Sequence, residues 1–414
     1  MTTYPLSAIR TLALHAQGLT TPNHGYTKAT LDSINKIVEK VNYVQIDTLN
    51  LIQRSQYIVL WSRLGNYTPA DFDRLIYSPE ERKLFEGVQG VAAIIPLKDY
   101  RYQLAQMDRG REALLKWYTR WLDGQENREM VSMVLERIRQ EGGLRASDFE
   151  YHGPKRGSWW DWKPAKIALE YLFVKGDLMI ANRVNFQRVY DLTERVLPPW
   201  VDTVPPTSEE RDRYWIERGL IALGICQPTQ LAEYAFHMRR AYPKAIWAEM
   251  LRQEIVVPVQ AILADGETHE LVIHRNQLET LQQASDGVIQ ARRTTFLSFF
   301  DSLFWCRGRD MQYWKYRNLL EAYNKEVNRK YGYFCLSILH HDSLIGRFDP
   351  KLERKTGVLR IKAIYLEEGV EQDEELVNGV ASAMRDFMAF HHAKELVIEK
   401  SQPEEFGEKL MRVL

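Results

Sequence analysis

The sequence predicts an α+β protein built from tandem winged-helix modules with a small C-terminal antiparallel β-barrel or sheet. Two neighbouring segments repeat the order of three helices followed by two strands, which is the order of a winged helix. The last third of the chain instead alternates apolar and polar residues, as strands do. A chain of 414 residues is too long for one core, so several modules are expected.

The clearest copy of the repeat lies at residues 126–203. Its expected elements are helices at 131–138, 147–150 and 163–175 and strands at 178–184 and 186–192. Pro164 in the first turn of the third helix and Gly176 just past its end agree with the usual positions of these residues. Asn185 separates the two strands and predicts a wing-like turn.

The second copy covers residues 204–285, after a linker at 204–207. Its expected elements are helices at 215–223, 228–236 and 243–254 and strands at 255–263 and 269–274. The pair Asp265-Gly266 predicts the hairpin turn between these strands. The two copies support each other, because the same order recurs in adjacent segments.

The first 125 residues are less regular and predict a modified third winged helix. Its expected elements are helices at 7–18, 30–40 and 69–76, a strand at 41–47 and a turn at 61–67. Ser7 is the expected N-cap of the first helix.

The final module, residues 286–414, differs in both pattern and charge. Its expected elements are strands at 331–340, 343–348, 358–366 and 396–399 and helices at 376–390 and 404–413. Net charge is zero for the whole chain, yet residues 286–362 hold fifteen Lys and Arg against eight Asp and Glu. One basic face on a neutral protein suits DNA binding, and a solvated face is the alternative explanation.

Composition favours a soluble cytoplasmic protein, and the expected binding to DNA would associate it with the nucleoid. No apolar run approaches the 18 residues of a membrane span, and the N-terminus lacks the pattern of a signal peptide. The three cysteines are far apart, so neither a disulfide framework nor a zinc site is expected.

The triplet Gln45-Ile46-Asp47 carries the most specific chemical prediction. In an extended strand Gln45 and Asp47 would share one face, while Ile46 anchors the other. The carboxylate can accept a proton from a water molecule whose direction the amide fixes. It can also stabilise the positive charge that develops on a sugar as a glycosidic bond breaks. From spacing alone, a capping role for Asp47 stays open.

The region around this triplet resembles the hallmark stretch of the AlkZ/AlkX (YcaQ) family of bacterial winged-helix DNA glycosylases, with Val44 in place of a usual Leu. The matching positions in this stretch are residues 44–48, Asn50, Arg54, Ser55, Tyr57 and residues 62–67. Further matches are Trp159, Trp160, residues 162–164, Arg183, residues 185–186 and 188–192, Trp305, Arg307, Arg309, residues 329–333 and Arg347. The resemblance spans about residues 12–387.

The resemblance implies tandem winged helices around a DNA-binding cleft. It implies Gln45 and Asp47 as the catalytic pair, with supporting roles for Asn50, Arg54 and Arg63. The implied reaction is hydrolysis of the N-glycosidic bond of N7-alkylated purines by a monofunctional glycosylase that also unhooks interstrand crosslinks. An N7-alkylated base is a cation and departs without a general acid, so we expect no cofactor. The expected partner is double-stranded DNA with alkylated or crosslinked purines, bound by a monomer.

Three positions depart from the family pattern. Residues 86–91 stand where relatives carry a Trp-x-His-Glu stretch, and they lack the Trp, the His and the second acid. Phe299 replaces a usual Pro, and Cys306 replaces a usual Asp. Two explanations stay open, a divergent paralogue with an altered substrate range or a reduced activity.

Several other side chains are candidates for DNA contact. The predicted phosphate ligands are Arg183, Arg188, Arg329, Lys330, Arg347, Arg354 and Lys355. The cluster Trp159, Trp160 and Trp162 fits either base stacking or packing between domains. Asp301 is expected to be a buried structural acid paired with Arg307.

Two other classes of function compete with the glycosylase. One is a winged-helix DNA-binding protein or transcriptional regulator without catalysis. The other is a damage sensor that binds alkylated DNA and recruits other proteins.

Overall fold

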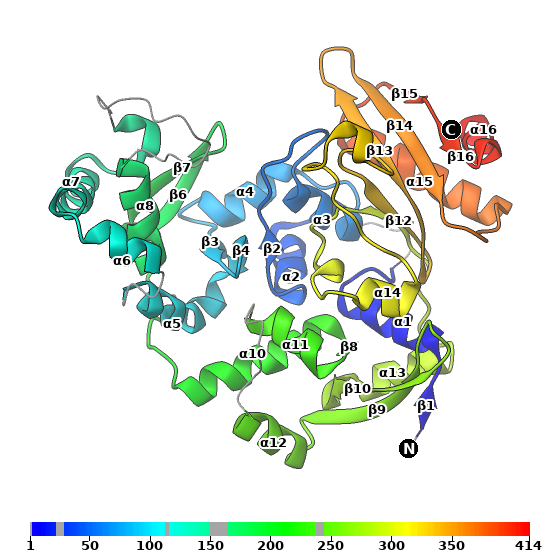
Figure 1. The fold of residues 1–414 in the computed structure, drawn as a ribbon, viewed down its shortest axis with the longest axis horizontal. Coiled ribbons are helices and arrows are strands. Elements are labelled where there is room, and N and C mark those ends of the chain that lie inside the picture. Colours follow the sequence, from blue (N-terminus) through cyan, green and yellow to red (C-terminus); the bar gives the residue numbers. More distant parts are fainter. Residues whose placement is uncertain (1, 22–28, 112–115, 150–163, 237–243) are drawn as a thin grey trace. The chain divides into compact units, whose positions relative to one another are not determined.

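The computed structural model describes residues 2–21, 29–111, 116–149, 164–236 and 244–414 (Figure 1). The chain divides into two compact units. Unit 1 comprises Met1–Pro69, Gln89–Ala93 and Glu209–Leu414, and unit 2 comprises Ala70–Val88 and Ile94–Ser208. The predicted α+β class is confirmed in both units. The cluster Trp159, Trp160 and Trp162 lies outside the described residues.

Unit 1 contains a four-stranded sheet. Its strands, in spatial order, are β1 (Thr3–Tyr4), β9 (Val256–Ile262), β10 (Thr268–His274) and β8 (Ile225–Cys226). The helices of this region are α1 (Leu6–Ala16), α10 (Ser208–Leu223), α11 (Pro228–Phe236), α12 (Lys244–Arg252), the 3-10 turn η3 (Arg275–Gln277) and α13 (Leu278–Ser285). The predicted hairpin is present as β9 and β10, which pair antiparallel. The sheet also takes in β1, which runs parallel to β9 and was not predicted.

The N-terminal part of unit 1 holds the triplet with the amide and the acid. Its elements are α2 (Leu31–Lys40), β2 (Val44–Gln45) and α3 (Ser55–Leu64). Thr30 caps α2 through a capping box. Its hydroxyl oxygen accepts the backbone N–H of Ser33, and the hydroxyl oxygen of Ser33 accepts the backbone N–H of Thr30.

Three local predictions for this segment were wrong. Pro5, not Ser7, is the N-cap of α1, and Ser7 lies inside the helix. The strand predicted at 41–47 is reduced to the two residues of β2. A helix, α3, occupies the segment where a turn was predicted to begin at Trp61. Eight of its ten residues are buried, so α3 shows no alternation of polar and apolar faces from which it could be recognised.

The C-terminal part of unit 1 is an open mixed sheet covered by helices. Its strands follow the order β11 (Thr294–Leu297), β12 (Leu336–His340), β13 (Ser343–Glu353), β14 (Val358–Leu366) and β15 (Glu395–Ile398), and β16 (Ser401–Gln402) also pairs with β14. The helices are α14 (Arg309–Trp314), α15 (Glu374–Phe390) and α16 (Glu404–Val413), with the 3-10 turns η4 (Ser302–Phe304) and η5 (Glu326–Asn328). Both β15 and β16 run parallel to β14, so the prediction of an antiparallel sheet or closed barrel is corrected. Phe387 of α15 packs against Phe296 and Phe348 of the sheet.

Unit 2 contains two small β elements and a group of helices. The strands are β3 (Leu84–Val88) and most of β4 (Ala92–Pro96), and then β5 (Leu144–Arg145), β7 (Gln187–Leu192) and β6 (Leu178–Val184) in a second sheet. The helices are α4 (Pro69–Tyr77), η1 (Leu97–Asp99), α5 (Tyr100–Arg111), α6 (Lys116–Leu122), α7 (Gln125–Glu141), η2 (Ala146–Asp148), α8 (Pro164–Lys175) and α9 (Thr193–Val196). The helix predicted at 163–175 and the two strands predicted at 178–184 and 186–192 are present as α8, β6 and β7, and the two strands pair antiparallel. Asn185 and Phe186 both have positive φ, as a tight two-residue hairpin turn requires.

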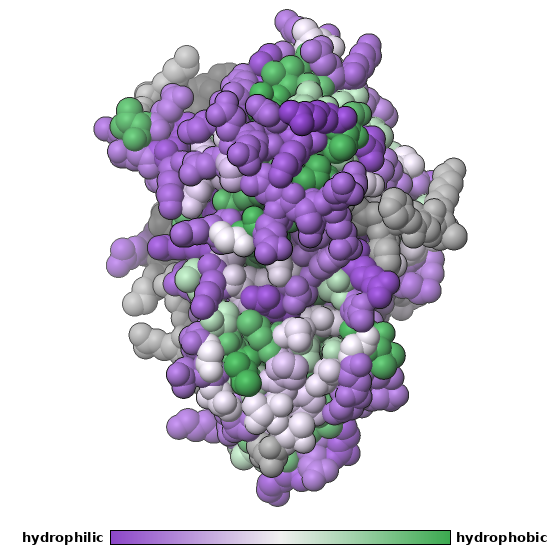
Figure 2. Space-filling model, turned by 90° about the vertical axis from the view of Figure 1, so that its right-hand side faces the viewer, coloured by the Kyte–Doolittle hydropathy of each residue, from purple (hydrophilic) through white to green (hydrophobic). Residues whose placement is uncertain are grey.

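Among the described residues, no helix combines the length and the apolar composition that crossing a bilayer requires. Figure 2 shows hydrophilic side chains spread over much of one face, with apolar groups in separate small patches.

Candidate active site and DNA-contact residues

The loop that follows β2 carries the candidate catalytic residues. Ile46 donates its backbone N–H to the carbonyl of Ala92 (2.9 Å), which fixes the end of the strand. The chain then leaves the strand and runs as a loop to Ser55, where α3 begins. Thr48 and Asn50 in this loop are exposed, so the loop lies at the surface.

Asp47 is held by the loop itself and not by strand pairing. Its Oδ2 accepts the backbone N–H of Leu49 (3.0 Å), and its own N–H donates to Oε1 of Gln56 (3.3 Å). The side chain is mostly buried, and the residue is 7% exposed. Burial raises the pKa of Asp47, and the N–H groups of Leu49 and Thr48 and the charge of Arg54 only partly oppose it. A raised pKa makes the carboxylate a better proton acceptor.

Gln45 differs from Asp47 in its surroundings. It ends β2, is partly exposed, and its side-chain amide forms no hydrogen bond with the residues that the structure describes. An unengaged amide can still orient a water molecule. The prediction that Gln45 and Asp47 project from one face of a strand is wrong, because β2 ends at Gln45. Asp47 lies in the loop that follows, where its carboxylate accepts the N–H of Leu49.

The predicted supporting residues have three separate roles. Arg54 is the N-cap residue of α3 and lowers the pKa of Asp47 through its charge. Arg63 forms a bidentate pair with Asp301 (2.6 and 2.8 Å), and both side chains are fully buried. Arg63 is therefore part of the core, and Asp301 pairs with Arg63 instead of the predicted Arg307. The third residue, Asn50, contacts Arg354.

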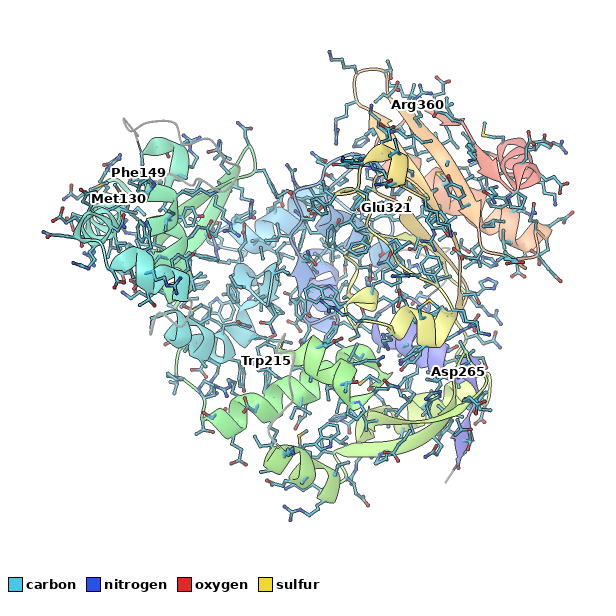
Figure 3. The ribbon with its side chains drawn as sticks, in the orientation of Figure 1. Met130, Phe149, Trp215, Asp265, Glu321 and Arg360 are labelled. Carbon is cyan, nitrogen blue, oxygen red and sulfur yellow. The ribbon has the colours of Figure 1, made fainter. Side chains whose placement is uncertain are left out.

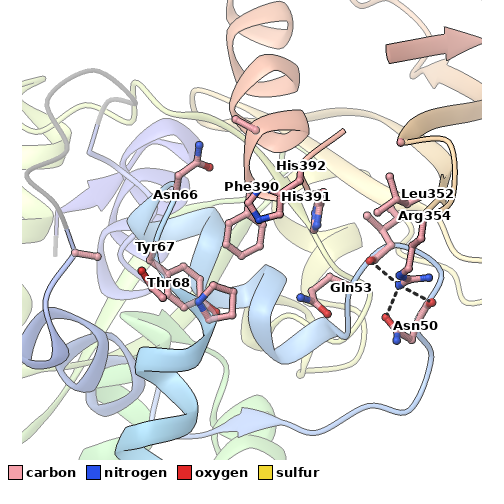
Figure 4. A pocket seen from close by; sticks show the side chains of 15 residues that line it. Asn50, Gln53, Asn66, Tyr67, Thr68, Leu352, Arg354, Phe390, His391 and His392 are labelled. Atoms are coloured by element: carbon pink, nitrogen blue, oxygen red, sulfur yellow. Dashed lines mark hydrogen bonds between the residues drawn. The ribbon is translucent and has the colours of Figure 1, made fainter. Parts of the chain in front are cut away.

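The β13–β14 hairpin is tied to the catalytic loop, a connection that the sequence did not reveal. Nη2 of Arg354 donates to the carbonyl of Asn50 (3.2 Å), to its Oδ1 (2.9 Å) and to the carbonyl of Ile52 (2.9 Å). Leu352 adds a backbone hydrogen bond to the carbonyl of Leu51 (3.2 Å). Figure 4 shows the bonds between Arg354 and the loop. The hairpin therefore fixes the backbone that follows Asp47.

The basic residues before β12 are held in a rigid turn. Glu321, labelled in Figure 3, accepts the backbone N–H groups of Lys330 (2.7 Å) and Tyr331 (2.8 Å). Lys330 is exposed and lies over the ring of Tyr331, and Arg329 lies over the ring of Tyr333. Their backbone is therefore fixed while their charges are not paired with a carboxylate.

Arg347 is buried instead of presented to solvent. Its guanidinium lies between the rings of Tyr316 and Tyr331, each 4.2 Å from the ring centre. It donates to Glu367 (2.7 Å) and to the carbonyl of Arg317 (2.8 Å). Arg347 is therefore engaged within the protein by Glu367, a backbone carbonyl and two tyrosine rings.

In unit 2, the predicted phosphate ligands Arg183 and Arg188 surround buried Glu86. Arg183 donates to both carboxylate oxygens of Glu86 (2.6 and 2.7 Å), and Arg188 donates to Glu170 (3.0 Å). Burial favours the neutral form of Glu86, but hydrogen bonds and charge from the two arginines outweigh it and lower the pKa of Glu86. The acid in the divergent stretch is therefore an ion-pair partner.

Comparison with known proteins identifies the family. The family model described as "DNA glycosylase AlkZ-like" matches residues 38–390. This range includes the triplet with Gln45 and Asp47. The fold is similar to that of the Streptomyces sahachiroi DNA glycosylase AlkZ, with a TM-score of 0.62 and 12% sequence identity over 96% of this chain and 100% of that chain. The resemblance stated from the sequence is confirmed, and the chain belongs to the AlkZ-like family of DNA glycosylases.

Proposed function

We propose that this protein is a monofunctional glycosylase that hydrolyses the N-glycosidic bond of N7-alkylated purines in double-stranded DNA and unhooks interstrand crosslinks formed through such purines. The observation that carries the proposal is the state of Asp47. Its carboxylate is mostly buried, has a raised pKa, and forms no ion pair with the residues that the structure describes.

The chemistry follows from one carboxylate and one amide. The bond between C1′ and the purine nitrogen breaks, and the electron pair leaves with the base, which becomes neutral because alkylation had made it a cation. Asp47 stabilises the positive charge that develops on the sugar. A water molecule oriented by Gln45 then attacks C1′, and its proton passes to Asp47 and on to solvent.

The local sequence supports hydrolysis over a covalent amine intermediate. Residues 44–68 contain no lysine, so this segment offers no amine to form a Schiff base with the sugar. We therefore expect an intact abasic site as product, without strand cleavage by the protein.

DNA contacts are proposed for the cations whose charges are not paired with a carboxylate. These are Arg329, Lys330, Arg354 and Lys355. Arg183, Arg188 and Arg347 are engaged by Glu86, Glu170 and Glu367, so we assign them to structural support.

The test uses a duplex oligonucleotide with one N7-methylguanine and a second duplex with a nitrogen-mustard crosslink. Alkaline cleavage of abasic sites reports base release under single-turnover conditions. Asp47→Asn is expected to lower the rate by about 10²- to 10³-fold, because it removes the charge that stabilises the sugar cation. The isosteric change keeps the acceptor for the N–H of Leu49.

Asp32→Asn is the matched control, since Asp32 is exposed and its ion pair within the described residues is with Lys36, four residues on. It should leave the rate unchanged. Binding of the methylated duplex without release of base by the wild-type protein would favour the non-catalytic alternative, and wild-type rates in Asp47→Asn would remove Asp47 from the mechanism.

A further inference from the structure

A cavity of about 620 Å³ lies in unit 1 beside the loop that carries Asp47 (Figure 4). Its walls come from the loop at 50–53, the segment at 66–69, the β13–β14 hairpin and the C-terminus of α15. The volume is in the range of small-molecule sites. No Asp or Glu is among the described residues that line it, although the chain has as many acidic as basic residues.

Three of the side chains that line this cavity, Asn50, Gln53 and Asn66, are amides whose oxygens are already engaged. The Oδ1 of Asn50 accepts from Arg354 (2.9 Å), the Oε1 of Gln53 accepts the next backbone N–H (3.2 Å), and the Oδ1 of Asn66 accepts from Nε1 of Trp61 (2.9 Å). Each of these partners can only donate, so each amide oxygen is assigned by chemistry. The three NH₂ groups are left without a hydrogen bond to the residues that the structure describes.

Arg354 adds positive charge to the same wall, and the rings of His391 and His392 also line it. All three hydrogen bonds of Arg354 come from Nη2, which leaves Nε and Nη1 without partners among the described residues. His391 is only 8% exposed, and its buried Nε2 has no hydrogen-bond partner in the described part of the chain. Burial, Arg354 and His392 together lower the pKa of His391 to about 3.

A wall that combines amide donors with the Arg354 cation, and has no carboxylate among its described residues, is suited to an anion with several oxygen atoms. We propose that this cavity binds a phosphate group, supplied either by the DNA backbone or by a free phosphate compound. We favour the DNA backbone as the source of the phosphate, and this choice rests on the proposed function, because Asn50 and Gln53 belong to the loop that carries Asp47. A backbone phosphate in the cavity would fix the register of the strand against that carboxylate.

The main test changes the charge of the wall without changing its shape. Asn66→Asp and Gln53→Glu each place a carboxylate in the cavity and keep the oxygen that accepts from Trp61 or from the backbone. Fluorescence anisotropy with an undamaged duplex should show about tenfold weaker binding near 0.1 M salt, and a salt dependence shallower by about one phosphate contact.

Gln290→Glu is the control, since it makes the same charge change on an exposed residue outside the cavity and keeps the acceptor for Arg292. It should bind the duplex as the wild type does. Circular dichroism verifies that each variant folds, and the second cavity variant keeps the test decisive if one of them does not.

The two sources of phosphate are separated by NMR of the histidine rings, with the signal of His391 assigned from His391→Gln. Saturable shifts caused by undamaged duplex support a backbone phosphate in the cavity. Shifts caused by inorganic phosphate alone support the site and assign it to a free phosphate compound. If neither ligand shifts the signals and both cavity variants bind the duplex normally, the inference is overturned.

These outcomes are distinct from failure of the proposed function. Normal base release, unchanged duplex affinity in both cavity variants and no shift of the histidine signals by either ligand would together reject the phosphate site and leave the glycosylase intact. Weakened duplex binding in the variants, without base release by the wild type, would support the phosphate site and reject the proposed reaction.

Discussion

Two buried carboxylates, Asp47 in unit 1 and Glu86 in unit 2, show how the same chemical group takes different roles in one chain. Glu86 is only 1% exposed and accepts bidentate hydrogen bonds from Arg183, with Arg188 nearby. Asp47 is 7% exposed and accepts a backbone N–H group instead. The pKa of Glu86 is lowered and that of Asp47 is raised.

The difference separates a structural acid from one available for chemistry. An ion pair fixes the charge of Glu86 and uses its lone pairs, so the group holds neighbouring elements of unit 2 together. Backbone N–H groups support the charge of Asp47 without neutralising it, so the carboxylate can still respond to a cation or a proton.

The largest expected effect is on the stability of unit 2. Glu86→Gln leaves Arg183 without its buried counter-charge and should cost about 3–5 kcal/mol. Amide hydrogen exchange in β6 and β7 should accelerate by at least about a hundredfold, which corresponds to the lower end of that cost. Exchange in β12 and β13 of unit 1 provides the internal reference.

Two further variants test whether the loss of stability is specific to the buried ion pair of Glu86. Glu141→Gln removes the acid of an exposed ion pair with Arg137. It should change the rates of amide hydrogen exchange in β6 and β7 very little. Asp47→Asn should leave unit 1 as stable as before at neutral pH or more so, because burial disfavours its charged form. A large loss of stability in Asp47→Asn with little change in Glu86→Gln would reverse the assignment of the two acids.

The second prediction concerns the pH dependence of base release. The raised pKa of Asp47 means that the carboxylate takes up a proton at a higher pH than an ordinary aspartate, whose pKa is about 3.9. The single-turnover rate should therefore be constant at neutral pH and fall about tenfold per pH unit below the pKa of Asp47.

The same shift has the opposite consequence for stability. In the folded state Asp47 binds its proton more tightly than in the unfolded state, so its contribution to stability increases as pH falls through the folded pKa. Glu86 behaves in the reverse sense, because its lowered pKa contributes stability that is lost on acidification. A rate that stays constant down to the ordinary aspartate pKa, in a protein still folded by circular dichroism, would contradict this role of Asp47.

Local patterns in the sequence predicted many of the helices and strands. The helix α11 and the helix α16 have the bounds that were predicted, and α8 begins within one residue of the predicted start. Periodic apolar residues with Pro at the start determine these elements locally. The helix α3 was missed because a helix buried on nearly all sides lacks that periodicity.

The site itself was only partly predictable. The triplet with Gln45 and Asp47 was found, but its support depends on contacts between distant parts of the chain. Arg354 is 304 residues from Asn50, and Arg63 is 238 residues from Asp301. Neither spacing nor composition can show which arginine reaches which acceptor, so the core pair and the tie between hairpin and loop required the structure.

The smallest expected effect is on DNA binding by single lysines. As with Asp47 and Glu86, the comparison is between a charged group without an ion-pair partner and one that has a partner. Lys355 is exposed on the β13–β14 hairpin and forms no ion pair with the described residues. Lys355→Gln should weaken binding of undamaged duplex a few-fold and lower the salt slope by about one. Lys36→Gln is the control, since Lys36 is also exposed but pairs with Asp32 (2.6 Å). An unchanged slope in Lys355→Gln, or an equal change in both variants, would show that exposure without a carboxylate partner does not mark the DNA contacts of this protein.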